Sequence, residues 1–273
     1  MIDLVDIKIY PIKSLAAISV ASAKVEPKGL ELDRRWMLVD EEGQFLSQRK
    51  DSQMALLQLA WANDQQDTLQ ISHRTSKIEP LHMPLGIPNS TERIQVKIWE
   101  DSVAAIPVSR AFDAWFSKAL QRECRLVYMP ESDQRGVDPN YAQPEDTVSF
   151  ADGFPYLLAN EASLEDLNQR LDLPVDLDRF RANLIIKGAQ AWAEDEWTGF
   201  KVGGVTFRSL KPCARCVLIT VDPLTGKKSP EPLRTLSQFR KRGHKVLFGM
   251  NACWDTNSGN ELKIGDRVIP DQA

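Results

Sequence analysis

The sequence predicts a mainly β protein with some helices, an α+β chain organised around β-barrels. Short segments in which apolar and polar residues alternate recur along the chain and end at proline or glycine, a pattern typical of barrels and sandwiches. Strands and helices do not alternate regularly, which disfavours a doubly wound parallel sheet. A chain of 273 residues can form two modest domains. With a boundary near residues 100–125, we divide it into residues 1–120 and 121–273.

The first half of the chain reads mainly as strands. Residues 5–10 alternate and stop at a proline, as a strand would. Residues 36–40 and 45–49 flank a Glu-Glu-Gly turn and predict a hairpin. Residues 69–72 and 94–99 alternate cleanly and predict two further strands.

Two helices are expected in the middle of the chain. Ser109 precedes residues 110–120, whose apolar side chains recur at helical spacing. Ser163 precedes residues 164–170, and Asp166 stands at the capping-box position. Between the two helices, residues 130–144 are rich in Pro, Asp and Gln, so we expect an exposed loop.

The last third of the chain returns to strands. Residues 183–188 form an apolar run that ends in glycine, and residues 200–208 predict a hairpin turning on Gly203 and Gly204. Residues 262–269 are expected to form the closing strand. A strand-rich chain with few helices is therefore predicted from end to end.

Composition limits the class of function. Hydrophobic residues make up 42% and charged residues 26% of the chain, as in an ordinary globular protein. The net charge of −4 argues against general nucleic-acid binding, which needs a basic face. No run approaches the roughly 18 apolar residues of a membrane span, and the first residues lack the basic start of a signal peptide. We expect a cytoplasmic enzyme with no membrane partner.

A pair of cysteines is the strongest chemical signal in the sequence. Cys213 and Cys216 are flanked by Lys211 and Arg215, and a nearby positive charge favours the thiolate. A zinc site needs about four ligands, of which this pair supplies two. A thioredoxin-like pair would start a helix, whereas Pro212 precedes the pair and the residues after it predict a strand.

Two interpretations of the pair then remain. A structural disulfide is disfavoured, because the chain has four cysteines and no secretory signal. Two half-buried core cysteines are one alternative. The other is a single reactive or metal-ligating thiolate at a strand edge, which the flanking charges favour.

Three loops at predicted strand ends carry side chains suited to bind an anion. Lys13 and Ser14 follow the first strand, Arg34 precedes another, and Arg181 and Asn183 precede a third. Such cations and polar groups bind phosphate by charge and by bidentate hydrogen bonds. Taken singly, each also fits a solvated loop charge. The chain has no dinucleotide fingerprint and no Walker loop.

Six motifs, in order along nearly the whole chain, resemble the MOSC proteins that carry an N-terminal β-barrel domain. The motifs occupy residues 9–14, 32–36, 154–158, 160–164, 179–183 and 211–216. Relatives in this family include the mitochondrial amidoxime-reducing components and the C-terminal part of molybdenum cofactor sulfurase. The resemblance implies a MOSC-type β-barrel preceded by a MOSC N-terminal β-barrel domain.

The resemblance also implies a bound molybdenum cofactor (Mo-molybdopterin). Its metal would be held by the pterin dithiolene and by one protein thiolate, by position Cys216, with Cys213 as the lesser candidate. Arg215 would adjoin the metal, and Asp195 belongs to a further family motif near the site. The family positions that hold the cofactor's phosphate and pterin match the following residues: Lys13, Ser14, Arg34, Arg181 and Asn183.

Two functions follow from the resemblance, and both stay open. The first is a molybdenum-dependent oxidoreductase that reduces small N-hydroxylated compounds, with residues 130–144 as a lid. Some bacterial relatives carry a C-terminal ferredoxin domain, but after Cys216 this chain has only Cys253. Electrons would therefore come from a separate iron–sulfur, flavin or cytochrome protein. The second is a sulfur carrier with a persulfide on Cys216; pyridoxal phosphate binding, a property of the family, would then belong to a separate desulfurase.

Overall fold

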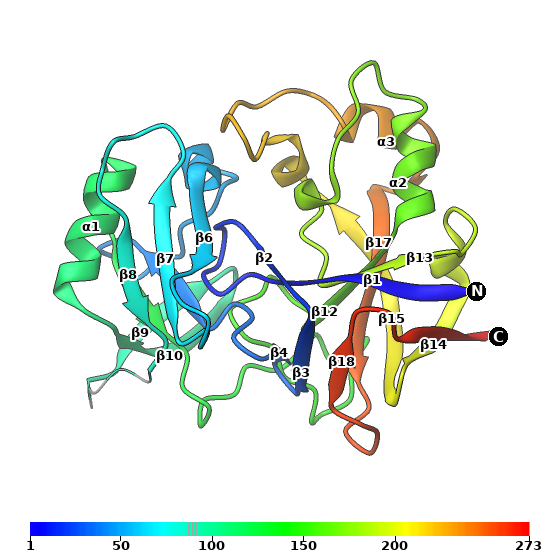
Figure 1. Cartoon of the computed structure of the whole chain (residues 1–273), viewed down its shortest axis with the longest axis horizontal. Coiled ribbons are helices and arrows are strands. Elements are labelled where there is room, and N and C mark those ends of the chain that lie inside the picture. Colours follow the sequence, from blue (N-terminus) through cyan, green and yellow to red (C-terminus); the bar gives the residue numbers. More distant parts are fainter. Residues whose placement is uncertain (87, 89, 91, 273) are drawn as a thin grey trace.

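The computed structural model describes residues 1–86, 88, 90 and 92–272, and it confirms a mainly β fold (Figure 1). The helices are α1 (Arg110–Leu120), α2 (Glu161–Asn168) and α3 (Leu233–Phe239), with 3₁₀ turns η1 (Ser52–Leu56), η2 (Leu177–Arg179), η3 (Ala193–Glu196) and η4 (Val217–Thr220). The strands are β1 (Ile2–Ile9), β2 (Ile18–Val20), β3 (Ser22–Glu26), β4 (Gly29–Leu30), β5 (Trp36–Val39), β6 (Leu57–Trp61), β7 (Thr68–His73), β8 (Leu81–Pro84), β9 (Ile94–Ile98), β10 (Asp101–Pro107), β11 (Arg125–Tyr128), β12 (Tyr156–Asn160), β13 (Leu184–Lys187), β14 (Trp197–Val202), β15 (Val205–Arg215), β16 (Lys241–Arg242), β17 (Lys245–Trp254), β18 (Glu261–Lys263) and β19 (Arg267–Gln272).

The C-terminal half forms a closed barrel. Its strands follow the order β12-β13-β1-β19-β14-β15-β17, and β17 pairs again with β12 to close the ring. Only β12 and β13 run parallel among these pairs. Closure leaves no free strand edge in the ring. Tyr156, Phe200 and Phe207 are completely buried and pack ring against ring in its core.

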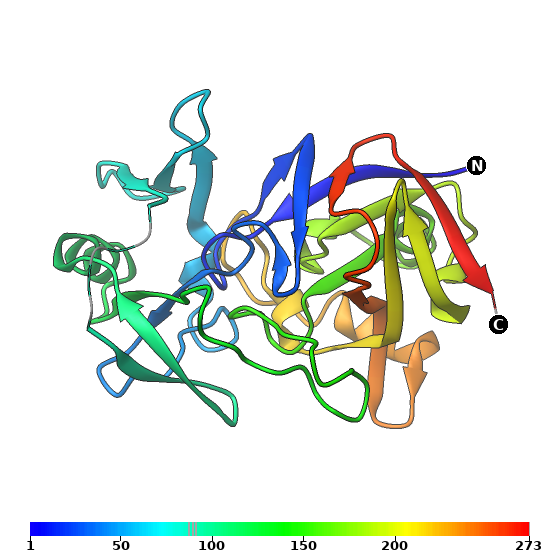
Figure 2. The ribbon, with the colours of Figure 1, turned by 90° about the horizontal axis from the view of Figure 1, so that it is seen from below.

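The N-terminal half forms a second unit beside the barrel, and Figures 1 and 2 show the two side by side. It contains the sheet β5-β11-β10-β9, the sheet β6-β7-β8 and helix α1. Phe116 and Leu120 on α1 are buried in the same apolar cluster as Leu69 and Ile71 of β7. We call this part of the chain the N-terminal unit.

The two units exchange segments. Strand β1 begins the chain yet lies between β13 and β19 of the barrel, and β11, after residue 120, pairs with β5 of the N-terminal unit. Between β1 and β5, β2 still pairs with β1 and β3 pairs with β18, so the chain joins the sheets of the N-terminal unit only at β5. The division at residue 120 stays a prediction.

Several predicted elements are confirmed. Helix α1 spans residues 110–120, and the Ser109 side chain accepts a hydrogen bond from the Ala111 backbone N–H. Strands β14 and β15 form the expected hairpin on Gly203 and Gly204. No helix in the described ranges is long and apolar enough to cross a membrane.

Other expectations were wrong in their details. Helix α2 begins at Glu161 with Asn160 as its N-cap, and Ser163 is buried inside it. Residues 217–220 form the 3₁₀ turn η4, not a strand. Residues 45–49 make one bridge, between Val39 and Phe45, in place of a hairpin. Residues 262–269 contain two strands, β18 and β19, separated by a turn.

The loop of residues 130–144 is not wholly exposed. Arg135 is buried and donates hydrogen bonds to the Asp101 carboxylate and to the Ser149 and Ala151 carbonyls. Val137 is buried as well. These anchors tie this part of the loop to the body of the protein.

Candidate functional site

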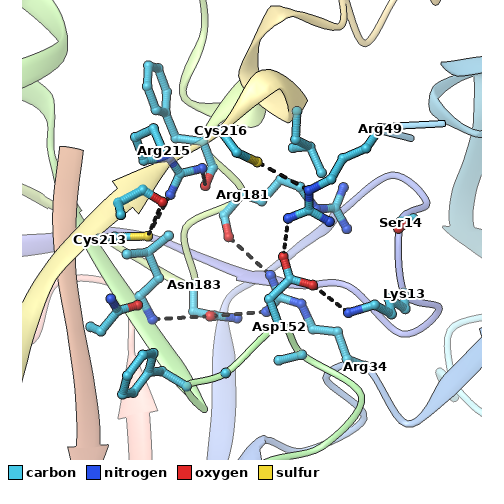
Figure 3. Close-up of a pocket in the computed structure, with 18 of the residues that line it drawn as sticks. Lys13, Ser14, Arg34, Arg49, Asp152, Arg181, Asn183, Cys213, Arg215 and Cys216 are labelled. Carbon is cyan, nitrogen blue, oxygen red and sulfur yellow. Dashed lines mark hydrogen bonds and ion pairs between the residues drawn. The ribbon is translucent and has the colours of Figure 1, made fainter. Parts of the chain in front are cut away.

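A cavity of about 320 Å³ lies between the barrel and the N-terminal unit (Figure 3). Every predicted site residue except Asp195 lines it. These residues are Lys13, Ser14, Arg34, Arg181, Asn183, Cys213, Arg215 and Cys216. Segments far apart in the sequence therefore converge on one cavity.

Cys216 stands where strand β15 ends and the turn η4 begins. The turn is closed by the Val221 N–H, which donates to the Leu218 carbonyl, and by the Thr220 hydroxyl, which donates to the Val217 carbonyl at 2.7 Å. These bonds fix the backbone just after the cysteine. The half-buried thiol of Cys216 faces the cavity, where Arg49 Nε donates to its Sγ at 3.2 Å.

Arg49 and its partner Asp152 are site residues that the sequence did not reveal. The Arg49 guanidinium contacts Cys216, pairs with the Asp152 carboxylate and lies 4.7 Å from the centroid of the Trp99 ring. Burial opposes the charge of Arg49, but Asp152 and Cys216 outweigh burial and raise its pKa. Arg49 and Cys216 are separated by 167 positions, and the only local signal was a cation at the end of a predicted strand.

Lys13 provides a buried cation at the base of the cavity. Its Nζ donates to the Phe150 carbonyl and to Asp152 Oδ1, both at 2.6 Å. Burial lowers the pKa of Lys13 to about 8, although Asp152 opposes this shift. Burial would raise the pKa of Asp152, but Lys13 and Arg49 hold it far below its usual range.

Two further guanidinium groups stack on one tyrosine. Arg34 and Arg181 lie 4.1 and 4.3 Å from the centroid of the Tyr10 ring. Arg34 also pairs with Asp33 and donates to Asn183 Oδ1 at 3.1 Å. Burial lowers the pKa of Arg181 to about 10 and raises that of Tyr10 to about 12. The Tyr10 hydroxyl is therefore uncharged at neutral pH, and its ring contacts both guanidinium groups.

Three cavity residues have a left-handed backbone. Ser14, Arg34 and Arg181 have φ angles of 67°, 51° and 56°. Non-glycine residues adopt this conformation rarely and at a cost of about 1–3 kcal/mol each, and such residues cluster at functional sites. The strain here occurs at three loops that direct polar side chains into one cavity.

Cys213, the other thiol of the motif, accepts a hydrogen bond from a different arginine. Arg215 Nη1 donates to Cys213 Sγ at 3.0 Å, and its Nη2 donates to the Phe180 carbonyl at 2.8 Å. Its buried Nε has no hydrogen-bond partner among the described residues. Lys211 Nζ lies 3.7 Å from the centroid of the Tyr141 ring. The flanking cations thus act differently from expectation, since Arg215 contacts Cys213 while Arg49 contacts Cys216.

Asp195 is not part of the cavity, contrary to expectation. It lies in η3 with a side chain 2% exposed, and its Oδ2 pairs with Arg240 and Arg242. Arg240 in turn lies 4.1 Å from the centroid of the Trp192 ring. These contacts give Asp195 a structural role at the C-terminal end of helix α3, which Arg240 caps.

The lining side chains suit an anionic ligand that brings its own metal. Within the described ranges, no three His, Cys, Asp or Glu side chains gather into a metal site. One accessible thiol could complete the coordination of a metal that is otherwise held by a cofactor. Six cations line the cavity against one carboxylate, Asp152; they are Lys13, Arg34, Arg49, Arg181, Lys211 and Arg215.

The fold and the site together define a β-barrel protein with a cationic cavity. Both cysteines of its C-x-x-C motif line this cavity, and each accepts a hydrogen bond from a different arginine. Residues 1–123 match the MOSC N-terminal beta barrel domain, and residues 145–269 match the MOSC domain. The chain belongs to the MOSC family.

Curated relatives carry two kinds of name. Mitochondrial amidoxime-reducing component 1 of Mus musculus is 34% identical over 95% of this chain and 79% of its own length. The Homo sapiens protein of the same name is 31% identical over 95% and 80%. Molybdenum cofactor sulfurase of Homo sapiens is 31% identical over 96% of this chain but only 31% of its own length.

Proposed function

We propose that this protein binds the molybdenum cofactor in the cavity and that Cys216 is the protein ligand of the metal. The observation that carries the proposal is a cavity lined by six cations and by two half-buried thiols, of which Cys216 occupies the ligand position of the family motif. The two buried thiols, Cys124 and Cys253, are less suited. Burial raises the pKa of Cys124 to about 11 and that of Cys253 to about 12, so neither offers a thiolate.

The cations divide into two groups by their partners. Lys13 and Arg49 share Asp152, whereas Arg34 and Arg181 stack on Tyr10. Lys13, Arg34 and Arg181, together with Ser14 and Asn183, would hold the phosphate and the pterin by charge-assisted hydrogen bonds. Arg215 would hold a ligand near the thiols, because it lines the cavity and its Nη1 already donates to Cys213 Sγ.

We further propose that the enzyme reduces small N-hydroxylated compounds. The relatives that this chain covers over 79% and 80% of their length are named amidoxime-reducing components. The bound cofactor would supply the two-electron chemistry that removes the hydroxyl oxygen. The role of the cavity residues is then to bind and orient the substrate beside Cys216. Electrons would come from a separate iron–sulfur, flavin or cytochrome protein, and a cytoplasmic location stays part of the proposal.

The alternative function is a sulfur carrier with a persulfide on Cys216. Two half-buried thiols line one cavity, each with an arginine N–H donor, and a thiol with such a neighbour suits sulfur transfer. The sulfurase relatives also support it, although this chain spans about a third of their length.

One experiment separates the two functions. Protein loaded with the cofactor would be mixed with an aromatic amidoxime and a chemically reduced electron donor, and amidine formation would be followed by chromatography. We expect turnover that is lost in Cys216→Ser. A loaded enzyme that forms no amidine, together with one extra sulfur atom on Cys216 by mass spectrometry, would favour the sulfur carrier.

A further inference from the structure

Arg49 has the geometry to hold a thiol sulfur in one place. Its Nε donates to Cys216 Sγ at 3.2 Å, its Nη2 pairs with Asp152, and its face lies 4.7 Å from the centroid of the Trp99 ring. A planar guanidinium held on two edges and one face has little freedom to rotate. Figure 3 shows Arg49 reaching across the cavity toward the thiol.

The backbone of Arg49 is fixed as well. Lys228 Nζ donates to the Arg49 carbonyl at 2.9 Å. The neighbouring Gln48 donates from Nε2 to the Ser14 carbonyl at 2.7 Å, and Ser14 belongs to the same cavity. The loop is therefore tied both to the barrel and to the segment that follows β1. A displacement of this loop would move the donor away from Cys216.

We propose that Arg49 is a positioning residue for Cys216, which keeps the sulfur directed into the cavity and places a fixed positive charge beside it. The consequence for the loaded enzyme rests on the proposed function. A hydrogen bond to a ligating sulfur tunes the metal that it holds. A cation at this position stabilises the more reduced, more negatively charged centre, so removing it should lower the reduction potential.

A test on the full-length, cofactor-free chain measures the charge beside the thiol. Cys216 would be alkylated with iodoacetate, an anion, and with iodoacetamide, which is neutral, and each rate would be read by mass spectrometry of the digested protein. At one pH the fraction of thiolate affects both rates equally. The ratio of the iodoacetate rate to the iodoacetamide rate therefore reports the charge near the sulfur. We expect Arg49→Met to lower this ratio at Cys216 about fivefold, as loss of a unit charge some 4 Å away in water would do.

Two matched controls accompany this test. Lys50→Met removes the same charge from the exposed neighbouring residue of the loop and should leave the ratio unchanged. Cys213 is an internal control, because its arginine donor is Arg215, so its ratio should not respond to Arg49→Met. Arg49→Gln keeps a donor without a charge and should reproduce the fall if Arg49→Met does not fold. An unchanged ratio at Cys216 in a folded variant overturns the proposal.

The loaded enzyme gives the second readout. Arg49→Met should bind molybdenum and show a lower midpoint potential and an altered Mo(V) electron paramagnetic resonance spectrum, while Arg49→Lys should restore both in part. Metal with wild-type potential and spectrum in Arg49→Met would overturn the tuning role. Wild-type protein without molybdenum would contradict the proposed function instead. The alkylation ratio would still test whether Arg49 places its charge beside Cys216.

Discussion

At the scale of single residues, the cavity concentrates positive charge in a protein whose net charge is −4. Lys13 shows the cost of this arrangement, since its side chain is only 5% exposed and burial lowers its pKa to about 8. The charge persists at neutral pH because Asp152 and the Phe150 carbonyl satisfy its N–H groups. An anionic ligand would add a further favourable partner.

The affinity of the cofactor-free protein for an anion should therefore depend on pH. Protonated Lys13 attracts an anion and neutral Lys13 does not, so the affinity for sulfate should fall as the pH rises through about 8. The decrease cannot exceed about tenfold per pH unit for one linked proton. Calorimetric titration with sulfate, which keeps its charge throughout this range, would measure it. The profile of Lys13→Met should be flat, and an equally steep profile in that variant would refute the assignment.

Replacement of Arg34 and replacement of Arg181 should differ in their effect on the free energy of unfolding. Asp33 is fully buried, and burial raises its pKa although Arg34 opposes the shift. Arg34→Met would leave this carboxyl without its cation and should cost about 3–5 kcal/mol of unfolding free energy. Because a raised pKa in the folded state makes stability fall as pH rises, the loss should be larger at pH 8 than at pH 5.

Arg181 is the matched comparison for Arg34. It stacks on the same Tyr10 ring, but its Nη1 donates to the Leu15 carbonyl at 2.7 Å and burial lowers its pKa to about 10. Arg181→Met removes a poorly solvated charge and should change stability by less than about 1.5 kcal/mol. Both variants should hold the cofactor less well. Urea unfolding curves would contradict this account if the two losses were equal.

Residue types at strand ends indicated candidate anion ligands, and only the family resemblance assigned them to one site. Lys13, Arg34 and Asn183 stand next to predicted strands, and the fold brings them together. Arg49 was not predictable, because its contact with Cys216 joins the two units of the molecule. Asp195 was misplaced because a charged residue in a short motif gives no sign of which neighbours will bury it.

At the scale of elements, the barrel depends on the contact that closes it between β12 and β17. Gly249 lies in β17 with φ +79°, and a Cβ there would stand 2.7 Å from the Leu158 carbonyl oxygen of β12. Gly249→Ala should therefore separate the closing strands and cost about 2–4 kcal/mol. Gly243 has φ +60° and open space around its Cβ position, so Gly243→Ala should cost only about 1–2 kcal/mol. Equal losses in urea unfolding would contradict the role of the closing contact.

The wrong predictions of helix and strand bounds share one physical cause, which is hydrogen bonding that a local sequence pattern does not reveal. The apolar, β-branched residues 217–220 predicted a strand, yet they form η4 because hydrogen bonds of the Thr220 hydroxyl and the Val221 N–H close a turn. Helix α2 begins earlier than expected because Asn160 caps it. Ser163 donates instead to the buried Glu194 carboxylate, a contact between residues 31 positions apart that no local pattern reveals.

At the scale of the whole molecule, the two units should unfold together. Strand β1 completes the barrel, and β11 completes the sheet of the N-terminal unit. Cutting the chain after residue 123, where the first family match ends, takes β1 from the barrel and β11 from its partner β5. We expect neither fragment alone to unfold cooperatively by calorimetry, and the intact chain to give one transition. A cooperative transition in an isolated fragment would show that the exchange of strands is dispensable.

The central claim is that Cys216 holds the metal of a cofactor bound in this cavity. The measurement that tests it most directly is the molybdenum and pterin content of protein expressed with molybdate in a host that makes the cofactor. We predict nearly one molybdenum and one pterin per chain in the wild type, no molybdenum in Cys216→Ser, and a milder loss in Cys213→Ser. Wild-type protein without either component, or Cys216→Ser with full molybdenum, would contradict the account.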